Sequence, residues 1–472
     1  MGVHLLIDFG STFTKVLAAD TDTEEVLGRA QAPSTVDRDI TIGLRNALDR
    51  LYAANPVVER VPIERRMACS SAAGGLRLIA VGLVPELTLE AARRAALGAG
   101  AKLVRSYGYE LSPESVAEIE ATPCDLILLA GGTDGGDKNV ILNNAERLAA
   151  SKVTASFVVA GNRVVAGSVA QMLAAAGKHV EIAANVLPEL NVLNVEPARA
   201  AIRETFIRRV VHAKGLDKAQ QYVGDILMPT PMATLKAARL VADGTEAEAG
   251  LGELMVVEIG GATTNVHTIC DGSPSQSDVL LKGLPEPYAK RTVEGDLGLR
   301  HNALTIVEVA GLQRIAEAFA SIDNHSSSKP DFQAYAAKVS SDPSLVPQSA
   351  EQFSIEAALA RAAVDLAVGR HAGSLEETPS WLGGTVRIQR GKDLGALATV
   401  IGTGGVFFHG RHAEQILSAA LVSKREPHSL RPRKANFYVD AGYVMYAVGL
   451  LSDVEPAKAL RIAKKWLRRV EA

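Results

Sequence analysis

The sequence predicts an α/β protein built from two lobes. Three observations support this prediction: strand and helix patterns alternate along the chain, the chain has 472 residues, and one hairpin motif occurs twice. Alternating strands and helices are typical of α/β domains with largely parallel sheets. A single hydrophobic core stops growing at roughly 250–300 residues, so a chain of this length is expected to form at least two lobes.

The repeated motif is a hairpin whose bend carries an acid, glycines and hydroxyls. In the first copy an apolar strand runs into Asp8 and a glycine turn, and in the second an equivalent strand runs into Glu258. The residues that leave each turn alternate with period 2, which is typical of a hairpin. A lone turn of this composition is usually an ordinary turn, because Asp, Gly, Ser and Thr dominate turns. Two copies that face one another could instead hold a polyphosphate.

The residue types in the two bends suit a nucleoside triphosphate and its metal ion. Turn glycines let backbone N–H groups approach phosphate oxygens, hydroxyls add donors, and Lys15 adds charge. Mg²⁺ keeps most of its waters and is held by one or two carboxylates, which predicts Asp8 and Glu258 as the catalytic acids and as metal ligands through water. The other nucleotide-binding candidates in the bends are Gly10, Ser11, Thr12, Gly260, Gly261, Ala262, Thr263 and Thr264.

A third glycine turn follows an apolar strand late in the chain. Its glycines, Gly402, Gly404 and Gly405, could lie flat against an adenine ring or a ribose. The three motifs resemble, in sequence order, the phosphate-1, phosphate-2 and adenosine motifs of the actin, Hsp70 and sugar-kinase superfamily. This resemblance implies a two-lobed actin-like ATPase fold of the ribonuclease H-like type, with ATP and Mg²⁺ in the cleft between the lobes.

Six longer stretches of sequence are more specific than any glycine turn. They cover residues 129–136, 185–190, 212–216, 228–231, 282–287 and 293–298. These stretches resemble the glutamate mutase accessory protein family, called GlmL or MutL. The resemblance implies an ATP-dependent accessory factor for an adenosylcobalamin-dependent mutase such as glutamate (methylaspartate) mutase, acting like the reactivases that exchange damaged cobalamin. The mutase subunits are then the expected protein partner, and homo-oligomerisation is left open.

Two positions depart from the superfamily pattern, in which an Asp usually stands in place of both Glu258 and Asn265. Glu258 keeps the charge but carries its carboxylate one methylene further, and misplacing a catalytic group by about 1 Å can cost on the order of 10²-fold. Asn265 has no charge. We therefore expect nucleotide binding to survive and hydrolysis to be slow.

The motifs also predict how the chain is divided. The expected parts are a first lobe over 1–250, an α/β subdomain inserted at about 100–215, a second lobe over 251–425 and a C-terminal helical segment over 426–472 docked on the body. Strand patterns at 102–107, 124–130, 155–160 and 179–184 predict the insertion. The glycine-rich loop 131–139 follows one of these strands, where open α/β sheets place ligands. This loop and residues 282–300 are candidate partner surfaces, although both could be structural.

Composition excludes several classes of partner. A formal net charge of −3 and a pI of about 6.4 give no pull toward nucleic acid or a membrane surface. The basic stretch 424–434 lacks interleaved aromatics and predicts a solvated loop, and residues 456–470 predict an amphipathic helix that docks on the body. Apolar runs stay shorter than the roughly 18 residues needed to cross a bilayer. The sequence therefore predicts a cytoplasmic protein.

Two other functions stay open at this point. A small-molecule kinase of the same superfamily would use the same cleft but would need a further carboxylate base near a hydroxyl substrate, which the sequence does not place. A nucleotide-binding scaffold without turnover is favoured by Glu258 and Asn265. The sequence thus leaves ATPase turnover undecided and favours an accessory factor over the mutase itself.

Overall fold

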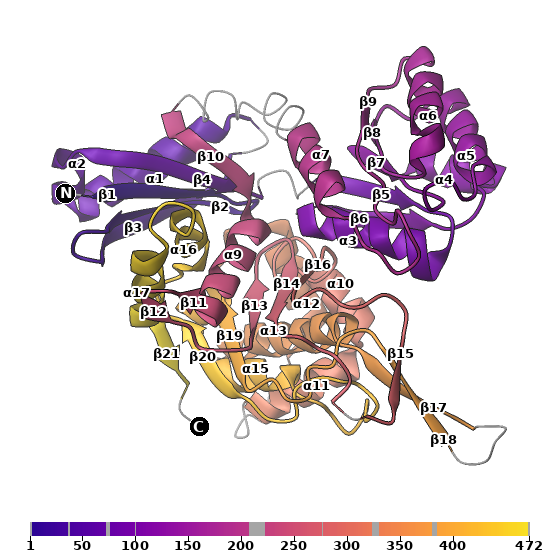
Figure 1. Cartoon of the computed structure of the whole chain (residues 1–472). Helices are drawn as coiled ribbons and strands as arrows, with labels where there is room; N and C mark the ends of the chain where they lie inside the picture. Colours follow the sequence, from indigo (N-terminus) through magenta and orange to yellow (C-terminus); the bar gives the residue numbers. More distant parts are fainter. Residues whose placement is uncertain are drawn as a thin grey trace. The chain divides into compact units, whose positions relative to one another are not determined.

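The computed structural model (Figure 1) describes residues 2–35, 38–71, 76–99, 101–206, 222–275, 277–322, 330–379 and 385–470. The chain forms two compact units. Unit 1 contains Met1–Ala72, Lys218–Lys282 and Glu286–Ala472, and unit 2 contains Ala73–Asp217 and Gly283–Pro285. The stretch 212–216, one of the six that carry the family resemblance, lies outside the described residues.

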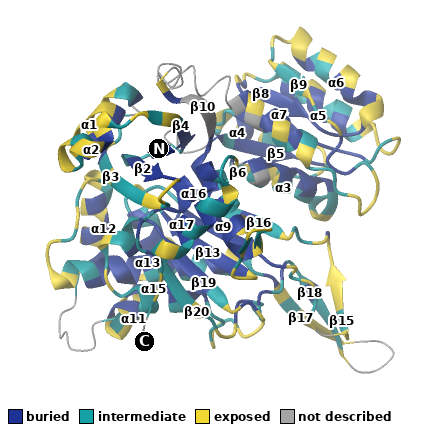
Figure 2. Ribbon diagram, turned by 60° about the vertical axis from the view of Figure 1, so that its left-hand side comes forward, coloured by how far each residue is buried: buried dark blue, intermediate teal, exposed yellow. Residues whose placement is uncertain are grey.

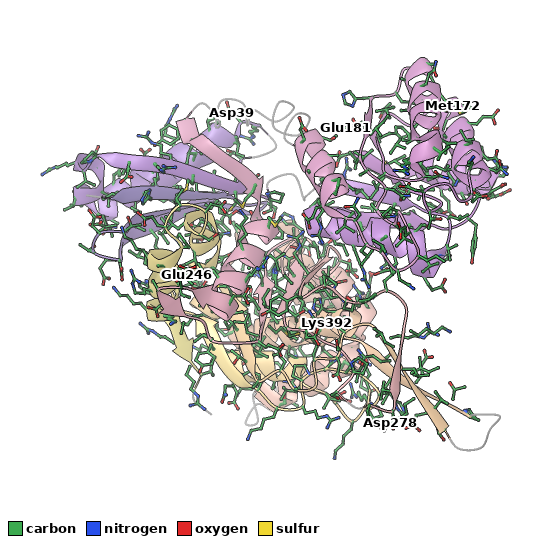
Figure 3. The ribbon with its side chains drawn as sticks, viewed as in Figure 1. Asp39, Met172, Glu181, Glu246, Asp278 and Lys392 are labelled. Atoms are coloured by element: carbon green, nitrogen blue, oxygen red, sulfur yellow. The ribbon has the colours of Figure 1, made fainter. Side chains whose placement is uncertain are left out.

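Unit 1 begins with a five-stranded sheet in the order β10-β4-β1-β2-β3. Its strands are β1 (Val3–Phe9), β2 (Phe13–Asp20), β3 (Glu25–Pro33), β4 (Ile63–Ser70) and β10 (Gly224–Pro229). The first three strands form an antiparallel meander, whereas β4 and β10 run parallel to β1. Helix α1 (Ile40–Ala54) packs against this meander, and α2 (Pro56–Arg60) follows it. Asp39, labelled in Figure 3, caps α1 by accepting the N–H of Thr41.

A second sheet in unit 1 repeats this topology, in the order β16-β14-β13-β19-β20-β21. Its strands are β13 (Leu254–Ile259), β14 (Thr264–Ile269), β16 (Ala289–Glu294), β19 (Thr399–Thr403), β20 (Asn436–Asp440) and β21 (Leu467–Arg469). Again three antiparallel strands are followed by two parallel ones. Leaving aside the edge strand β21, both sheets read 3-2-1-4-5 when their strands are numbered in chain order. This duplication is the two-lobed actin-like, ribonuclease H-like fold, and the predicted fold class is confirmed.

Three helices join the two sheets into one core. They are α9 (Thr230–Asp243), α16 (Met445–Leu451) and α17 (Pro456–Trp466). Their apolar side chains pack with Leu6 and Met67 of the first sheet and with Val256 and Ile401 of the second. Burial of this shared apolar surface, rather than any single bond, is what holds the two halves together. Figure 1 shows α9 and α16 beside both sheets.

The other face of the second sheet is covered by helices around a separate core. They are α10 (Ala303–Ala310), α11 (Leu312–Ile322), α12 (Phe332–Ser341), α13 (Ala350–His371), α14 (Gly405–His409) and α15 (Ala413–Leu417). A small sheet of β15 (Val279–Lys282), β18 (Thr385–Arg390) and β17 (Ser374–Pro379) extends from this half, and Figure 2 shows its exposed residues. The pair β11 (Gly244–Thr245) and β12 (Glu248–Ala249) completes unit 1.

Unit 2 is a doubly wound α/β fold with five parallel strands in the order β6-β5-β7-β8-β9. The strands are β5 (Arg77–Val81), β6 (Lys102–Tyr107), β7 (Leu126–Leu129), β8 (Ser156–Val159) and β9 (Val180–Ile182). A turn of π-helix over Pro85–Leu89 precedes α3 (Glu90–Ala99), and α4 (Pro113–Ala121), α5 (Asn139–Ala150), α6 (Arg163–Ala175) and α7 (Glu196–Phe206) follow. The four predicted strands of the insertion are present, and β5 belongs to the same sheet.

Two local predictions near the C-terminus are wrong. The helix expected over 456–470 ends at Trp466, because Leu467–Arg469 pairs with β20 as an edge strand. The basic stretch 424–434 is not wholly solvated, since Arg431 is 2% exposed and forms ion pairs with Asp365 and Glu426. Among the described residues, no helix has the length and apolar character needed to cross a membrane.

Candidate functional site

Asp8 stands at the end of β1, where its side chain is buried among polar partners. Its Oδ2 accepts a hydrogen bond from Lys15 Nζ at 2.6 Å, and its Oδ1 accepts one from Thr230 Oγ1 at 2.6 Å. The β1–β2 register places Lys15 opposite Asp8. Burial alone would lower the pKa of Lys15, but the Asp8 carboxylate and the adjacent Tyr443 raise it well above its usual value. Lys15 is therefore a fixed positive charge beside this carboxylate.

Glu258 occupies the matching position at the end of β13. Its Oε2 accepts a hydrogen bond from Asn265 Nδ2 at 2.9 Å, and its Oε1 accepts one from Thr234 Oγ1 at 3.2 Å. His267 Nε2 lies 3.4 Å from Oε2. Burial would raise the pKa of Glu258, but His267, Asn265 and Lys15 together hold it below its usual value. The carboxylate is thus charged and held in place by its neighbours.

The longer Glu258 side chain is accommodated because its neighbour at position 265 is an asparagine. The two residues are register partners across the β13–β14 hairpin, so a carboxylate at both positions would place like charges side by side. The Asn265 amide instead donates to the Glu258 carboxylate. The two departures from the superfamily pattern therefore act together as one local arrangement.

Helix α9 brings the two acids to one place. It starts directly after β10, and its residues Thr230 and Thr234 lie one turn apart on the same face. Thr230 donates to Asp8 and Thr234 donates to Glu258. The acids of two hairpins that are 250 residues apart in the sequence are thus held by successive turns of one helix.

The bends of the two hairpins have matching geometry. The Gly10 N–H donates to the Phe13 carbonyl at 3.1 Å, and the Gly260 N–H donates to the Thr263 carbonyl at 2.9 Å. Each bend is therefore closed by one backbone hydrogen bond of the same kind. Ser11 and Thr12 are partly exposed in the first bend, as are Gly261, Ala262 and Thr263 in the second.

The two bends also touch each other. Thr12 Oγ1 lies 3.3 Å from His301 Nε2, and a Cβ at Gly261 would lie 2.3 Å from Thr12 Oγ1. The two bends therefore lie in contact with each other. A polyphosphate placed between them would require the bends to separate.

The remaining nucleotide-binding candidates have different surroundings. The Thr264 hydroxyl donates to the Leu297 carbonyl inside the protein. Gly402 lies under the Phe407 ring, and Gly404 adopts φ 115° against the Ile259 backbone, so both glycines are required by packing. A Cβ added at Gly405 would meet nothing within 4 Å. Of the three glycines in this turn, Gly405 is thus the one where a side chain would meet no neighbour.

The donor set around the two acids fits a hard divalent cation. Asp8 and Glu258 supply carboxylate oxygens, which Mg²⁺ prefers. The buried Asn265 Oδ1, next to Glu258, has no hydrogen-bond partner, and an acceptor oxygen of this kind is suited to bind a metal-bound water. Among the described residues no group of three or more acidic, His or Cys side chains lies close enough together to hold a metal ion directly.

Sequence reasoning missed several residues of this site. Thr230 lies within the stretch 228–231, and Thr234 lies just after it. That stretch carries part of the family resemblance, but the sequence assigns no role to either threonine. Tyr443, at φ 51°, places its ring 4.7 Å from Lys15 Nζ, and burial raises the pKa of its hydroxyl. Asp440 caps α16 through the Val444 N–H. The spacing of two threonines by four residues at a helix start was the available signal for the first pair.

Comparison with known proteins identifies the family. The family model described as MutL protein matches residues 4–467. Protein MutL of Clostridium tetanomorphum is 45% identical over 472 residues, which is all of both chains. The chain belongs to the MutL protein family. The resemblance to the glutamate mutase accessory family is thereby confirmed.

Solved structures give weaker likenesses. Nucleotide-free acetone carboxylase is 14% identical with a TM-score of 0.40, covering 96% of this chain and 70% of its own. Component A of the (R)-2-hydroxyglutaryl-CoA dehydratase of Acidaminococcus fermentans is 10% identical with a TM-score of 0.30, covering 98% and 99%. The activator of the 2-hydroxyisocaproyl-CoA dehydratase of Clostridium difficile, with bound ADPNP, is 10% identical with a TM-score of 0.32, covering both chains fully. Likenesses this distant carry no argument about ligands or partners.

Proposed function

We propose that this MutL family protein is an ATP-binding accessory factor that reactivates an adenosylcobalamin-dependent mutase such as glutamate (methylaspartate) mutase. The accessory factor would exchange or protect the cobalamin cofactor of the mutase through a closure of its lobes that is driven by ATP. Family membership over residues 4–467 supports the partner class. The single observation that supports the nucleotide is the convergence of two acid-ended hairpins on one helix in unit 1.

The proposed nucleotide site uses the bends and the acids in separate roles. Ser11, Thr12 and Thr263 would donate to phosphate oxygens, together with backbone N–H groups of the bends, and Gly405 would lie against the nucleoside. Asp8 and Glu258 would hold Mg²⁺ through its waters. The metal ion would supply charge neutralisation for the phosphates. Nucleotide entry would part the contact between Thr12 and Gly261.

Turnover is expected to be slow. Glu258 already accepts hydrogen bonds from Thr234 and Asn265, so its oxygens are less free to orient an attacking water. The same observation favours the alternative of a nucleotide-binding scaffold without turnover. A small-molecule kinase would require another carboxylate base beside the bends, whereas the side chains that the structure describes as hydrogen-bonded to the two acids are Lys15, Thr230, Thr234 and Asn265, with Cys69 at 3.6 Å from Asp8.

Coupling to the mutase would work through differential affinity. A clamp shifts its partner's equilibrium only when it binds the partner differently in its open and closed states. We propose residues 131–139 of unit 2 and residues 282–300 as the partner surfaces. In unit 2 the first of these loops is held by Asn162, which donates to the Gly136 and Asp137 carbonyls, so it presents a defined surface.

The test is spectroscopic. The mutase is loaded with an inactive cobalamin, this protein is added with Mg²⁺ and ATP, and release of the corrinoid is followed by absorbance. Release that needs ATP and disappears in Asp8→Ala is the expected result. Absence of release despite demonstrated ATP binding would refute the reactivase role and favour the scaffold. Phosphate transfer to a small molecule would favour the kinase.

A further inference from the structure

We infer that the outer edge of β15 is a docking surface for a second copy of this chain, whose β15 pairs with it antiparallel about a twofold axis at Leu280. This inference goes beyond the proposed nucleotide function and does not depend on it. It follows from the edge position, the exposure and the sequence of one strand in unit 1.

Strand β15 is an exposed edge of the small three-stranded sheet. The strand order is β15-β18-β17, so among the strands that the structure describes β15 pairs only with β18. Leu280 is 61% and Leu281 is 38% exposed, and Figure 2 shows the strand at the surface. An edge strand presents unpaired backbone N–H and C=O groups, which natural proteins protect with charges, proline or a bulge. An exposed apolar edge is therefore suited to receive a further strand.

The opposite edge of the same sheet is protected. Strand β17 carries Glu376 and Glu377 at its centre and ends at Pro379. At its start, the Leu375 N–H donates to the His428 carbonyl at 2.8 Å. Two copies of β17 paired about either central residue would set glutamates opposite each other, which is unfavourable. Of the two edges of this sheet, β15 is thus the one suited to a partner strand.

The sequence around β15 is self-complementary in an antiparallel pair. With Leu280 opposite its own copy, Asp278 lies opposite Lys282 and Val279 lies opposite Leu281. Residues directly opposite each other share a face of the sheet, so the dimer gains two pairs of opposite charges. A twofold axis at Val279 would set Asp278 opposite Leu280, and one at Leu281 would set Lys282 opposite Leu280. Both of these registers lose the charge pairs.

The neighbouring strand extends this pattern. The β15–β18 register places Leu280 beside the half-buried Ile388. In the dimer, Ile388 and Leu280 of each copy therefore form one apolar row across a continuous six-stranded sheet. Asp278, labelled in Figure 3, forms an ion pair with Arg387 of its own chain, which keeps its carboxylate at the start of β15. The pairing is isologous and covers the exposed edge of both copies.

The contact is small, so the dimer is expected to be weak and reversible. One short strand from each copy buries much less than the roughly 1,200 Å² at the lower end of standard stable interfaces. Sedimentation equilibrium of the full chain over about 1–300 µM brackets a dissociation constant on the order of 10–100 µM, the range that we expect for such a contact.

Leu280→Lys tests the position of the twofold axis. It would bring two lysines together at the centre of the pair, and the variant should stay monomeric over the whole concentration range. Leu312 of α11 offers a matched control, because it is 51% exposed and also belongs to unit 1. Leu312→Lys should associate as the wild type does. Circular dichroism checks that both variants are folded.

Two charge variants test the register. Lys282→Asp sets an aspartate opposite Asp278, and Asp278→Lys sets a lysine opposite Lys282, so each variant alone should associate about tenfold more weakly or worse. An equimolar mixture of the two should recover the association, because every pair in the mixed dimer again joins opposite charges. Glu377→Lys is the control. It makes the same change of charge opposite Arg387 on β17 and should leave the association unchanged.

A wild-type chain that stays monomeric at every concentration would overturn the inference, as would a dimer that a folded Leu280→Lys variant does not weaken. If that variant does not fold, the charge variants decide. Weakening by both charge variants without recovery in the mixture would overturn the antiparallel pairing. A monomeric wild type in which Leu280→Lys abolishes binding to the mutase would assign β15 to that protein and overturn the pairing of two copies. These measurements contain no ATP, so their failure is separate from failure of the proposed function.

Discussion

Replacing Gly449 with alanine should destabilise unit 1 by driving α16 away from α9. A Cβ at this position would lie 1.8 Å from the Ala233 carbonyl oxygen, which is backbone and cannot rotate aside. Carbon atoms in ordinary contact are about 3.5–4.0 Å apart, so the helices would have to separate by more than about 1 Å. Overpacking of this kind costs about 3 kcal/mol, whereas alanine gains about 1 kcal/mol over glycine in a helix.

The free energy of unfolding should therefore fall by about 2 kcal/mol in Gly449→Ala. Urea unfolding followed by tryptophan fluorescence measures this directly, because Trp466 belongs to unit 1 and the sequence of unit 2 contains no tryptophan. Gly167 of α6 in unit 2 is the matched control, since nothing lies within 4 Å of its Cβ position. Gly167→Ala should leave the fluorescence transition where it is. Equal or greater stability of Gly449→Ala would refute the close approach of the two helices.

Two further predictions concern buried charge. Arg431→Met should lower the free energy of unfolding by about 1–3 kcal/mol, because the hydrogen bonds from the buried guanidinium to Asp365 and Glu426 are lost while both carboxylates keep access to water. The exposed Lys434→Met is the control, and the same urea midpoint in both variants would contradict the prediction. Burial, reinforced by nearby lysines, lowers the pKa of His371 well below its usual value, so the unfolded state alone takes up a proton below pH 6.5. Stability should then fall by about 1.4 kcal/mol per pH unit below that point, and His371→Asn should flatten the slope of the urea midpoint between pH 6.5 and 5.

The sequence predicted the two hairpins because their signals are local. An acid at the end of an apolar strand, a glycine turn and a period-2 strand leave little freedom in register, so Asp8 falls opposite Lys15 and Glu258 opposite Asn265. The duplication then determined the fold, since each hairpin forms the centre of one sheet.

Contacts between residues that are far apart in the sequence could not be predicted in the same way. The ion pair between Arg431 and Asp365 joins residues that are 66 positions apart, so the local sequence of the basic stretch does not predict it. Thr230 and Thr234 gain their role only when α9 is placed between the sheets. The apolar pattern of Arg77–Val81 predicts a strand but does not indicate which strand it pairs with. Its position beside Lys102–Tyr107 in unit 2 depends on tertiary contacts.

The hydrogen bond between Asn265 and Glu258 predicts how the rate of ATP hydrolysis changes when aspartates, the residues of the superfamily pattern, replace both side chains. Asn265→Asp alone would place a second carboxylate opposite Glu258, at a site where the amide nitrogen and the carboxylate oxygen are now 2.9 Å apart. Two carboxylates this close raise the pKa of one of them. The variant should therefore bind ATP more weakly in the presence of Mg²⁺. Adding Glu258→Asp shortens the second side chain and relieves this crowding.

We therefore expect the double variant Glu258→Asp with Asn265→Asp to hydrolyse ATP faster than the wild type, by up to on the order of 10²-fold, because a carboxylate displaced by about 1 Å can cost that much. Phosphate release under single-turnover conditions measures the chemical step apart from product release. Each single variant should be no faster than the wild type, so the gain would appear only in combination. A fast single variant would mean that Glu258 and Asn265 act independently, and a double variant as slow as the wild type would mean that the length of Glu258 does not limit turnover.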